Sequence, residues 1–441
     1  MSNIEQSGSI PTLGIFNLKK AQQSQKVGIV FKNHQKRWAK ITPENKKELY
    51  NPGDVMKFRM KGQGVDYINF DSSFLMMQVY VDAVTTHFLN GSYDMIYRQQ
   101  TRSGAFNLED VIEANRFLTF EFTGSVHGYH ENHGFLDHFS QTSIGAASID
   151  LPITKLTAIW VKVPFRTILD AGDYIPIYQL AETLDLIFTL NSTAKTLYSI
   201  ANDYHVVDAY ILADGLVATN NSVLDNSPYK FPSVAILNFV DQIGNLINYN
   251  EANTKGLRKT VTHDIKKTSL KKWVGGFFSD TPVVFENLSH PREYPLSLDV
   301  EAIEFSMGGI LYPYINGLDS KQLLWTEVQR YFHLLENTIS TIANRYLQYN
   351  TTWFRESTAD NIGFYNNHFP AFFCACFDRL NQRNDIVSGL DTERNDVNIT
   401  FKGLKGCIDG NGNILPIMYL ISFYIYNIMV TILGGEIKIE D

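Results

Sequence analysis

The sequence predicts an all-β protein, and three observations lead to this fold class. The 441 residues are 44% hydrophobic and 13% aromatic, a composition that favours strands. Only 19% of the residues are charged, which leaves enough apolar surface for a large core. From Val55 onward, short apolar runs alternate with turn residues, mostly without helical segments between them. Strands in this order are typical of β-sandwiches rather than of folds that alternate strands and helices.

The first 50 residues are polar and basic, unlike the rest of the chain. Nine Lys and Arg residues lie between Lys19 and Lys47 against one acidic residue, Glu44, although the net charge of the chain is −8. We interpret residues 1–50 as an extended arm that contacts DNA or an internal membrane, with a solvated arm as the alternative. The residues assigned to this contact are Lys19, Lys20, Lys26, Lys32, Lys36, Arg37 and Lys40.

Short strands are expected along the remainder of the chain. Each one combines β-branched or aromatic residues and ends at Gly, Asn, Asp or Pro. The expected strands lie within residues 67–83, 156–169, 184–190, 204–217, 233–240, 281–288, 297–309 and 396–404.

One segment has helical rather than strand periodicity. From Leu324 to Tyr346 the apolar residues recur in steps of three and four, which places them on one helix face. Asp319 or Ser320 can cap this helix. We therefore expect a helical insertion at about residues 320–347 that covers an edge or end of a sheet.

The run Ile414–Leu433 is twenty residues long, carries no charge and could span a bilayer. Three features favour a buried strand or strand pair instead. A turn sequence, DGNGN, precedes the run; Asn427 lies inside it; and three acidic residues with one Lys follow it, where a membrane anchor has basic residues. We expect the strand to end at Gly434–Gly435, before an edge segment EIKIE, and a tail anchor is the alternative.

No residue pattern gives a recognisable active site. Weak candidates for metal ligands are His127, His130, His133 and His138, but they lack the His-Glu-x-x-His spacing, so we favour a histidine-rich loop without metal. Cys374, Cys376 and Cys407 could approach in space, but a structural zinc site usually has Cys-x-x-Cys pairs and a fourth ligand, so we expect free buried thiols. The spacing of Cys374 and Cys376 would place both on one face of a strand. Phosphate-binding loops, dinucleotide-binding glycines and nucleophile elbows are not recognisable. We therefore expect a structural protein with no cofactor and no enzymatic activity.

Three stretches contain strand and turn motifs in an order that is found in a known protein family. They are GVDYINFDSSFLMMQVYV (64–81), YHVVDAYILADGLV (204–217) and a long stretch from Thr260 to Pro313. The matching positions are Tyr67, Ile68, Ser72, Leu75, Val207, Asp208, Ala209, Leu212, Gly276, Pro282, Val283, Val284, Pro295, Leu296, Leu298, Gly309 and Pro313. This order resembles the major capsid proteins of the Polinton (Maverick), adintovirus and virophage-like group, in the adenovirus-hexon-like lineage. The middle of that family's first domain is not recognisable between Asn90 and Pro152.

The resemblance implies two tandem eight-stranded jelly rolls with short helical insertions. The arm would cover residues 1–50, the first jelly roll 51–220 and the second 221–441. It also implies a major capsid protein that assembles as pseudo-hexameric homotrimers into the icosahedral shell of a double-stranded DNA virus or virus-like mobile element. Partners would be neighbouring capsomers, penton and minor capsid proteins, in a virion assembled in the host nucleus or cytoplasm. The alternative is a β-sandwich carbohydrate-active enzyme or glycan-binding protein.

Overall fold

The computed structural model of the chain describes most of two β domains. The described residues are 34–82, 86, 88, 91–124, 151, 153–170, 174–197, 203–218, 228–243, 256–279, 300–312, 317–319, 323, 326–327, 330–331, 372–377, 389–404 and 418–440. The four histidines proposed as metal ligands and the basic residues Lys19, Lys20, Lys26 and Lys32 lie outside them.

The first domain consists of two antiparallel sheets that face each other. One sheet has the order β1 (His34–Ile41), β9 (Tyr204–Ala218), β3 (Tyr67–Val81), β6 (Ile159–Val163), and the short β7 (Ile175–Pro176) pairs with β3. The other has the order β2 (Val55–Arg59), β8 (Leu184–Leu190), β4 (Ile96–Ser103), β5 (Phe106–Ile112). Their inner faces enclose a core that includes Phe58 and Phe188, whose rings are 5.9 Å apart.

The second domain repeats this construction. One sheet has the order β10 (Tyr229–Gln242), β17 (Met418–Leu433), β12 (Leu270–Ser279), β15 (Phe372–Cys376), and β18 (Glu436–Glu440) pairs with β17. The other has the order β11 (Leu257–His263), β16 (Val397–Leu404), β13 (Ala302–Met307), β14 (Ile310–Tyr312).

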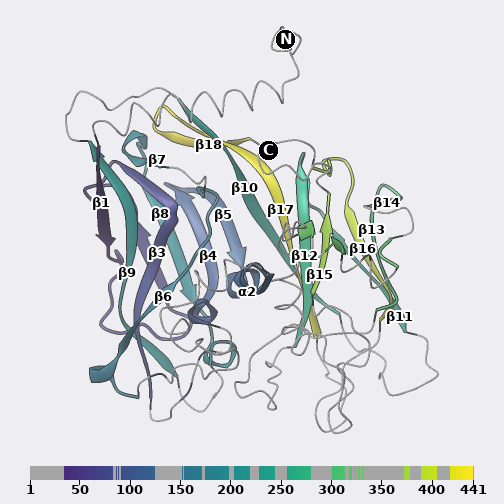
Figure 1. Cartoon of the computed structure of the whole chain (residues 1–441), viewed down its shortest axis with the longest axis horizontal. Helices are drawn as coiled ribbons and strands as arrows, with labels where there is room; N and C mark the ends of the chain where they lie inside the picture. The colour runs from purple at the N-terminus through teal and green to yellow at the C-terminus, as the bar shows by residue number, and fades with distance from the viewer. Residues whose placement is uncertain are drawn as a thin grey trace, which may run out of the picture.

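The two domains have the same topology. With β7 and β18 set aside, the described residues of each domain form eight strands, and numbering them along the chain gives the sheet orders 1-8-3-6 and 2-7-4-5 in both. Two facing four-stranded sheets of this kind form a jelly roll. The prediction of two tandem eight-stranded jelly rolls is thereby confirmed, and Figure 1 shows the two rolls side by side.

Helical segments follow the fifth strand of each roll. In the first roll, α2 (Ala114–Gly124) follows β5 and lies between the two rolls in Figure 1. In the second roll, Leu323, Thr326, Glu327, Arg330 and Tyr331 are helical and follow β14. The rest of the predicted insertion at 320–347 lies outside the described residues. The other helical turns within the described residues are η2 (Ser92–Met95), η4 (Lys155–Thr157), η5 (Ile177–Gln179) and η6 (Thr193–Lys195).

The uncharged run near the C-terminus contains the long strand β17. It is buried on both faces: Leu420 and Tyr424 pack in the core of the second roll, whereas Ile421, Phe423 and Ile425 pack toward the first roll. The run carries no charge because most side chains on both faces of its strand are buried. Within the described residues, no helix has the length and apolarity needed to cross a membrane.

The turn after β17 is as expected. Gly434 and Gly435 join β17 to β18, and both have positive φ, 63° and 92°. A two-residue hairpin turn with positive φ at both positions is the type that favours glycine. The edge strand β18, EIKIE, exposes its charged residues and half-buries its two isoleucines.

The first jelly roll begins earlier than the sequence indicates. Residues 34–41, assigned to the basic arm, form β1, which pairs with β9 along its whole length. Ala39 and Ile41 are buried in the core, and their burial fixes this strand in the sheet. Lys36, Arg37 and Lys40 therefore lie on a strand of the first roll.

Candidate assembly interface

The outer face of the β1-β9-β3-β6 sheet carries apolar side chains where an isolated sandwich would expose polar ones. On β3, Leu75, Met77 and Val79 are fully buried in the core, so Phe74 and Met76 lie on the opposite face. The register places the outward side chains of the other strands beside them. The nine residues that we call the aromatic–basic face are Lys36, Trp38, Lys40, Phe74, Met76, Trp160, Lys162, Tyr210 and Leu212.

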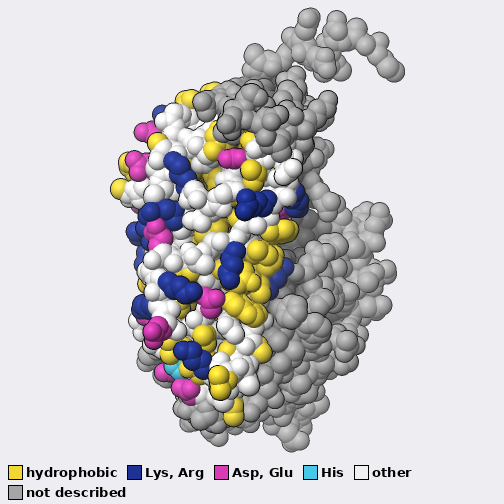
Figure 2. All heavy atoms as spheres, turned by 90° about the vertical axis from the view of Figure 1, so that its left-hand side faces the viewer, with side chains coloured by type: hydrophobic (Ala, Val, Ile, Leu, Met, Phe, Trp, Pro, Cys, Tyr) yellow, Lys and Arg dark blue, Asp and Glu magenta, His cyan; other side chains and the backbone are white. Residues whose placement is uncertain are grey.

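Lysine side chains on this face lie over aromatic rings. The Nζ atom of Lys40 is 4.2 Å from the centre of the Tyr210 ring, and that of Lys162 is 4.6 Å from the centre of the Phe74 ring. The rings of Trp160 and Tyr210 are 5.0 Å apart. Cation–π contacts of this kind hold the cations in place while leaving ring edges accessible. Figure 2 shows hydrophobic and basic side chains interleaved on this side of the molecule.

A buried carboxylate anchors one end of the aromatic–basic face. Asp214 on β9 accepts hydrogen bonds from Ser72 Oγ at 2.7 Å and from Tyr174 OH at 3.1 Å, and its Oδ2 lies 3.0 Å from Lys36 Nζ. A register shift of β3 between Asn69 and Phe74 brings Ser72 to this position. The hydrogen bond with Asp214 raises the pKa of Lys36 above its usual value, so Lys36 is charged at physiological pH.

The outer face of the β11-β16-β13-β14 sheet, on the other roll, is different in kind. Thr260 and Thr400 lie 2.9 Å apart across two strands, and Thr262 donates a 2.7 Å hydrogen bond to Asn398. The carboxylate of Glu304 accepts from Lys402 on the neighbouring strand. Short polar side chains dominate, and we call this surface the hydroxyl face: Thr260, Thr262, Asn398, Thr400, Glu304, Ser306 and Lys402.

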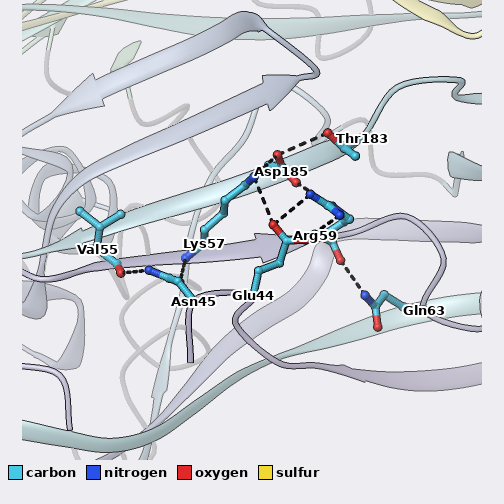
Figure 3. Close-up of polar contacts among 8 residues, drawn as sticks. All are labelled: Glu44, Asn45, Val55, Lys57, Arg59, Gln63, Thr183 and Asp185. Carbon is cyan, nitrogen blue, oxygen red and sulfur yellow. Dashed lines mark hydrogen bonds and ion pairs between the residues drawn. The ribbon is translucent and has the colours of Figure 1, made fainter. Parts of the chain in front are cut away.

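A network of ion pairs lies on the β2-β8-β4-β5 sheet (Figure 3). Lys57 Nζ is 3.1 Å from Glu44 and 2.9 Å from the buried Asp185, and Arg59 pairs with Glu44 at 2.7 Å. The hydrogen bond with Asp185 raises the pKa of Lys57. The side chain of Asn45 donates a hydrogen bond to Val55 O and accepts one from Lys57 N. Two cations and two anions balance here, so this network ties the segment after β1 to β2 and β8.

The structure brings together only part of the predicted arm. Lys36 and Lys40 belong to the aromatic–basic face, and Arg37 lies on the same strand. Cys374 and Cys376 are buried on one face of β15 and are not joined in a disulfide, as predicted. Among the described residues, no group of three His, Cys, Asp or Glu side chains is placed to hold a metal ion.

The aromatic residues of the face were missed by the sequence analysis. Their signal was present: in β6, IWVKV, and β9, aromatic residues occupy the positions that alternate with the buried ones. Such positions normally carry polar residues in a sheet with one solvated face.

Comparison with known proteins identifies similar structures but no similar sequences. No family model and no curated protein matches the chain. A chain of the PBCV-1 virus capsid aligns with TM-score 0.61 and 10% identity, over 93% of this chain and 97% of that chain. A chain of the Sputnik virophage structure aligns with TM-score 0.51 and 12% identity, over 92% and 88%. The mavirus major capsid protein aligns with TM-score 0.51 and 10% identity, over 93% and 90%.

These alignments cover both rolls and nearly the whole of each compared chain. Because only about a tenth of the aligned residues are identical, these alignments establish the fold alone. The chain has the double jelly-roll fold of viral major capsid proteins.

Proposed function

We propose that this chain is a major capsid protein, which assembles as pseudo-hexameric homotrimers into the icosahedral shell of a double-stranded DNA virus or virus-like mobile element. The observation that carries the proposal is the fold: two rolls of identical topology, aligned over 93% of the chain with capsid chains. The role is structural and needs no cofactor. A relationship to the major capsid proteins of the Polinton and adintovirus group is part of this proposal.

The two outer faces suggest how copies join. Within one chain, the 2-7-4-5 sheet of the first roll lies on the side of the 1-8-3-6 sheet of the second, with β5 against β10. The chain leaves a 1-8-3-6 sheet, with the aromatic–basic face, at one end and a 2-7-4-5 sheet, with the hydroxyl face, at the other. A second copy can repeat the internal arrangement by placing its hydroxyl face on the aromatic–basic face. We propose that this head-to-tail contact closes into a ring of three copies, which brings together six rolls.

Further partners extend the same proposal. Neighbouring capsomers, penton and minor capsid proteins would contact the outside of this ring. The basic residues before β1 would contact DNA or an internal membrane, in a virion assembled in the host nucleus or cytoplasm. Lys36 and Lys40 are engaged with Asp214 and Tyr210, and Arg37 lies with them on β1. This leaves the role to the residues that precede β1: Lys19, Lys20, Lys26 and Lys32.

Light scattering after size exclusion tests the proposal. We expect about 150 kDa, three times the 50.2 kDa chain mass, with the mass unchanged on dilution. Trp160→Glu and Tyr210→Glu place a carboxylate in the proposed contact and should give the 50.2 kDa monomer with an unchanged circular dichroism spectrum. Phe106→Glu is the matched control, because Phe106 is 75% exposed at the β4–β5 turn, away from both faces. A wild-type monomer would refute the proposed assembly.

A further inference from the structure

The two rolls meet along a seam between β5 and β10. The side chain of Asn238 on β10 accepts a hydrogen bond from Ile112 N at 3.2 Å and donates one to Ile112 O at 3.0 Å. This pair of bonds imitates the pairing of two strands and joins one roll to the other. The seam therefore depends on polar contacts as well as on the apolar core between the rolls.

Glu109 lies at the centre of this seam. It extends from β5 and is 6% exposed. Its Oε1 accepts from Ile236 N of β10 at 3.3 Å, and its Oε2 accepts from Ile168 N, in the segment after β6, at 3.0 Å. One carboxyl group thus holds backbone from both rolls.

A second acidic group, Asp170, lies close by. Its Oδ2 accepts from Thr167 N at 3.0 Å, and among the described residues its buried Oδ1 has no hydrogen-bond partner. Its backbone oxygen faces Ser233 Oγ of β10 at 3.5 Å. The guanidinium of Arg166 lies 3.9 Å from Asp170 Oδ2, but the Arg166 side chain is 44% exposed. The charge of Asp71 acts on Asp170 in the opposite direction to that of Arg166.

Burial keeps both groups protonated to unusually high pH. Loss of hydration, together with the charge of Asp170, raises the pKa of Glu109 to about 8, against the lowering effect of its two backbone hydrogen bonds. Loss of hydration and the charge of Asp71 raise the pKa of Asp170 to about 7. The charged side chains that act on Glu109 in the described structure are Asp170 and Asp110, and both are acidic.

We propose that the β5–β10 seam is a pH-sensitive contact, which holds the two rolls together most tightly in acidic solution and loosens progressively as the pH rises into the mildly alkaline range. The protonated Glu109 spans the seam as a neutral group. Once Glu109 and Asp170 both lose their protons, two like charges lie in a buried site, and the cation described beside Asp170, Arg166, is half-exposed and shared with Asp71. The carboxylates therefore gain hydration when the seam opens.

The direction of the effect follows from proton linkage. A carboxyl group whose folded pKa is raised binds its proton more tightly when the seam is closed. Closure is therefore fully favoured below the usual carboxyl pKa, weakens as pH rises, and levels off above the folded pKa of about 8. Between pH 7 and 8, where Asp170 has largely titrated, the opening equilibrium of the seam should rise by about tenfold per pH unit.

Hydrogen exchange of the amides at the seam measures this opening directly. The amides of Ile236, Ile168 and Ile112 would be followed from pH 6 to 9 on the full chain, with each rate divided by its intrinsic rate. We expect the tenfold rise between pH 7 and 8 and a plateau above. The amides of β16 in the second roll, such as Ile399, serve as an internal control and should show no such rise.

Two variants separate titration at the seam from a general effect of alkali. Glu109→Gln keeps the shape, cannot ionise, and should flatten the rise at Ile236 and Ile168. Asp170→Asn removes one of the two like charges and should move the midpoint of the rise to lower pH. A flat wild-type profile, or an equal rise in wild type and Glu109→Gln, would overturn the proposal. Neither outcome depends on trimer formation, which light scattering reports independently.

Discussion

At the scale of single residues, Gly275 and Trp273 illustrate how tightly the second roll is packed. Trp273 is fully buried and its ring lies 5.9 Å from that of Phe305. A Cβ atom at Gly275 would lie 2.7 Å from Trp273 Cζ2 and 3.3 Å from Ile421 O. The backbone of Gly275 is not left-handed, so the space taken by the indole, and not backbone conformation, requires glycine here.

Gly275→Ala should therefore destabilise the fold by overpacking. We expect a loss of about 1–3 kcal/mol in the free energy of unfolding, measured by denaturant titration. Trp273→Phe provides the control, because the smaller ring removes the atom that clashes. In the Trp273→Phe background, Gly275→Ala should cost about 1 kcal/mol less than in the wild type. Equal costs in the two backgrounds would show that the indole does not impose the glycine.

Residue types alone predicted the burial of some side chains but not of others. Cys374 and Cys376 were predicted as buried thiols because their spacing places both on one strand face, and the structure confirms this. Glu109 carried no signal, since an acidic residue on a strand is normally exposed. Its burial depends on β10, more than a hundred residues away, and such contacts cannot be obtained from local pattern.

At the scale of elements, the prediction of strands succeeded where one sheet face was apolar. The strand β8 occupies the predicted residues 184–190, and β9, β13 and β16 lie at their predicted places. The strands β4 and β5 were missed. In β4, IYRQQTRS, the inward positions Gln99 and Thr101 are polar and buried, so the alternation of apolar and polar residues that identifies a strand is lost.

The strand β17 couples the two rolls through Phe423. Its ring is fully buried and lies 5.3 Å from the ring of Phe117 and 6.0 Å from that of Phe120, both on α2. Phe423→Ala should lower the free energy of unfolding by about 3–5 kcal/mol, because it leaves a cavity between the rolls. Val234→Ala on the adjacent β10 is the control. Val234 is 38% exposed, and its truncation should change the stability by about 0.5 kcal/mol or less.

Differential scanning calorimetry would show how the loss is distributed. If β17 joins the rolls into one cooperative unit, wild type should unfold in one transition and Phe423→Ala should separate it into two. An unchanged single transition at the wild-type temperature would contradict the coupling through α2 and β17.

At the scale of the whole molecule, the order of strands could not be predicted from residue patterns alone. Short apolar runs indicated sandwiches, but the eight-strand division of each roll came from the resemblance to capsid proteins. The identical orders 1-8-3-6 and 2-7-4-5 in both halves confirm that architecture. The same topology can be built from different sequences, because it needs apolar residues at alternate positions and those can vary.

The described chain implies that the second roll is not self-sufficient. Val274, Phe278 and Phe423 form a buried apolar surface on the outside of its β10-β17-β12-β15 sheet, and α2 of the first roll covers it. A contiguous apolar surface of this kind favours aggregation when its cover is removed. Fragments 1–222 and 223–441, cut between β9 and β10 and produced together, should therefore copurify in equal amounts.

Production of fragment 223–441 alone completes this test. We expect an insoluble or self-associated product, because its exposed sheet face has no cover. Phe423→Ala in this fragment should weaken its association with fragment 1–222, measured by titration calorimetry, whereas Val234→Ala should not. A soluble, monomeric and cooperatively folded second fragment would show that each roll is an independent domain. The shared apolar face would then hold together two domains that can fold apart, and the seam at Glu109 would be a contact between them.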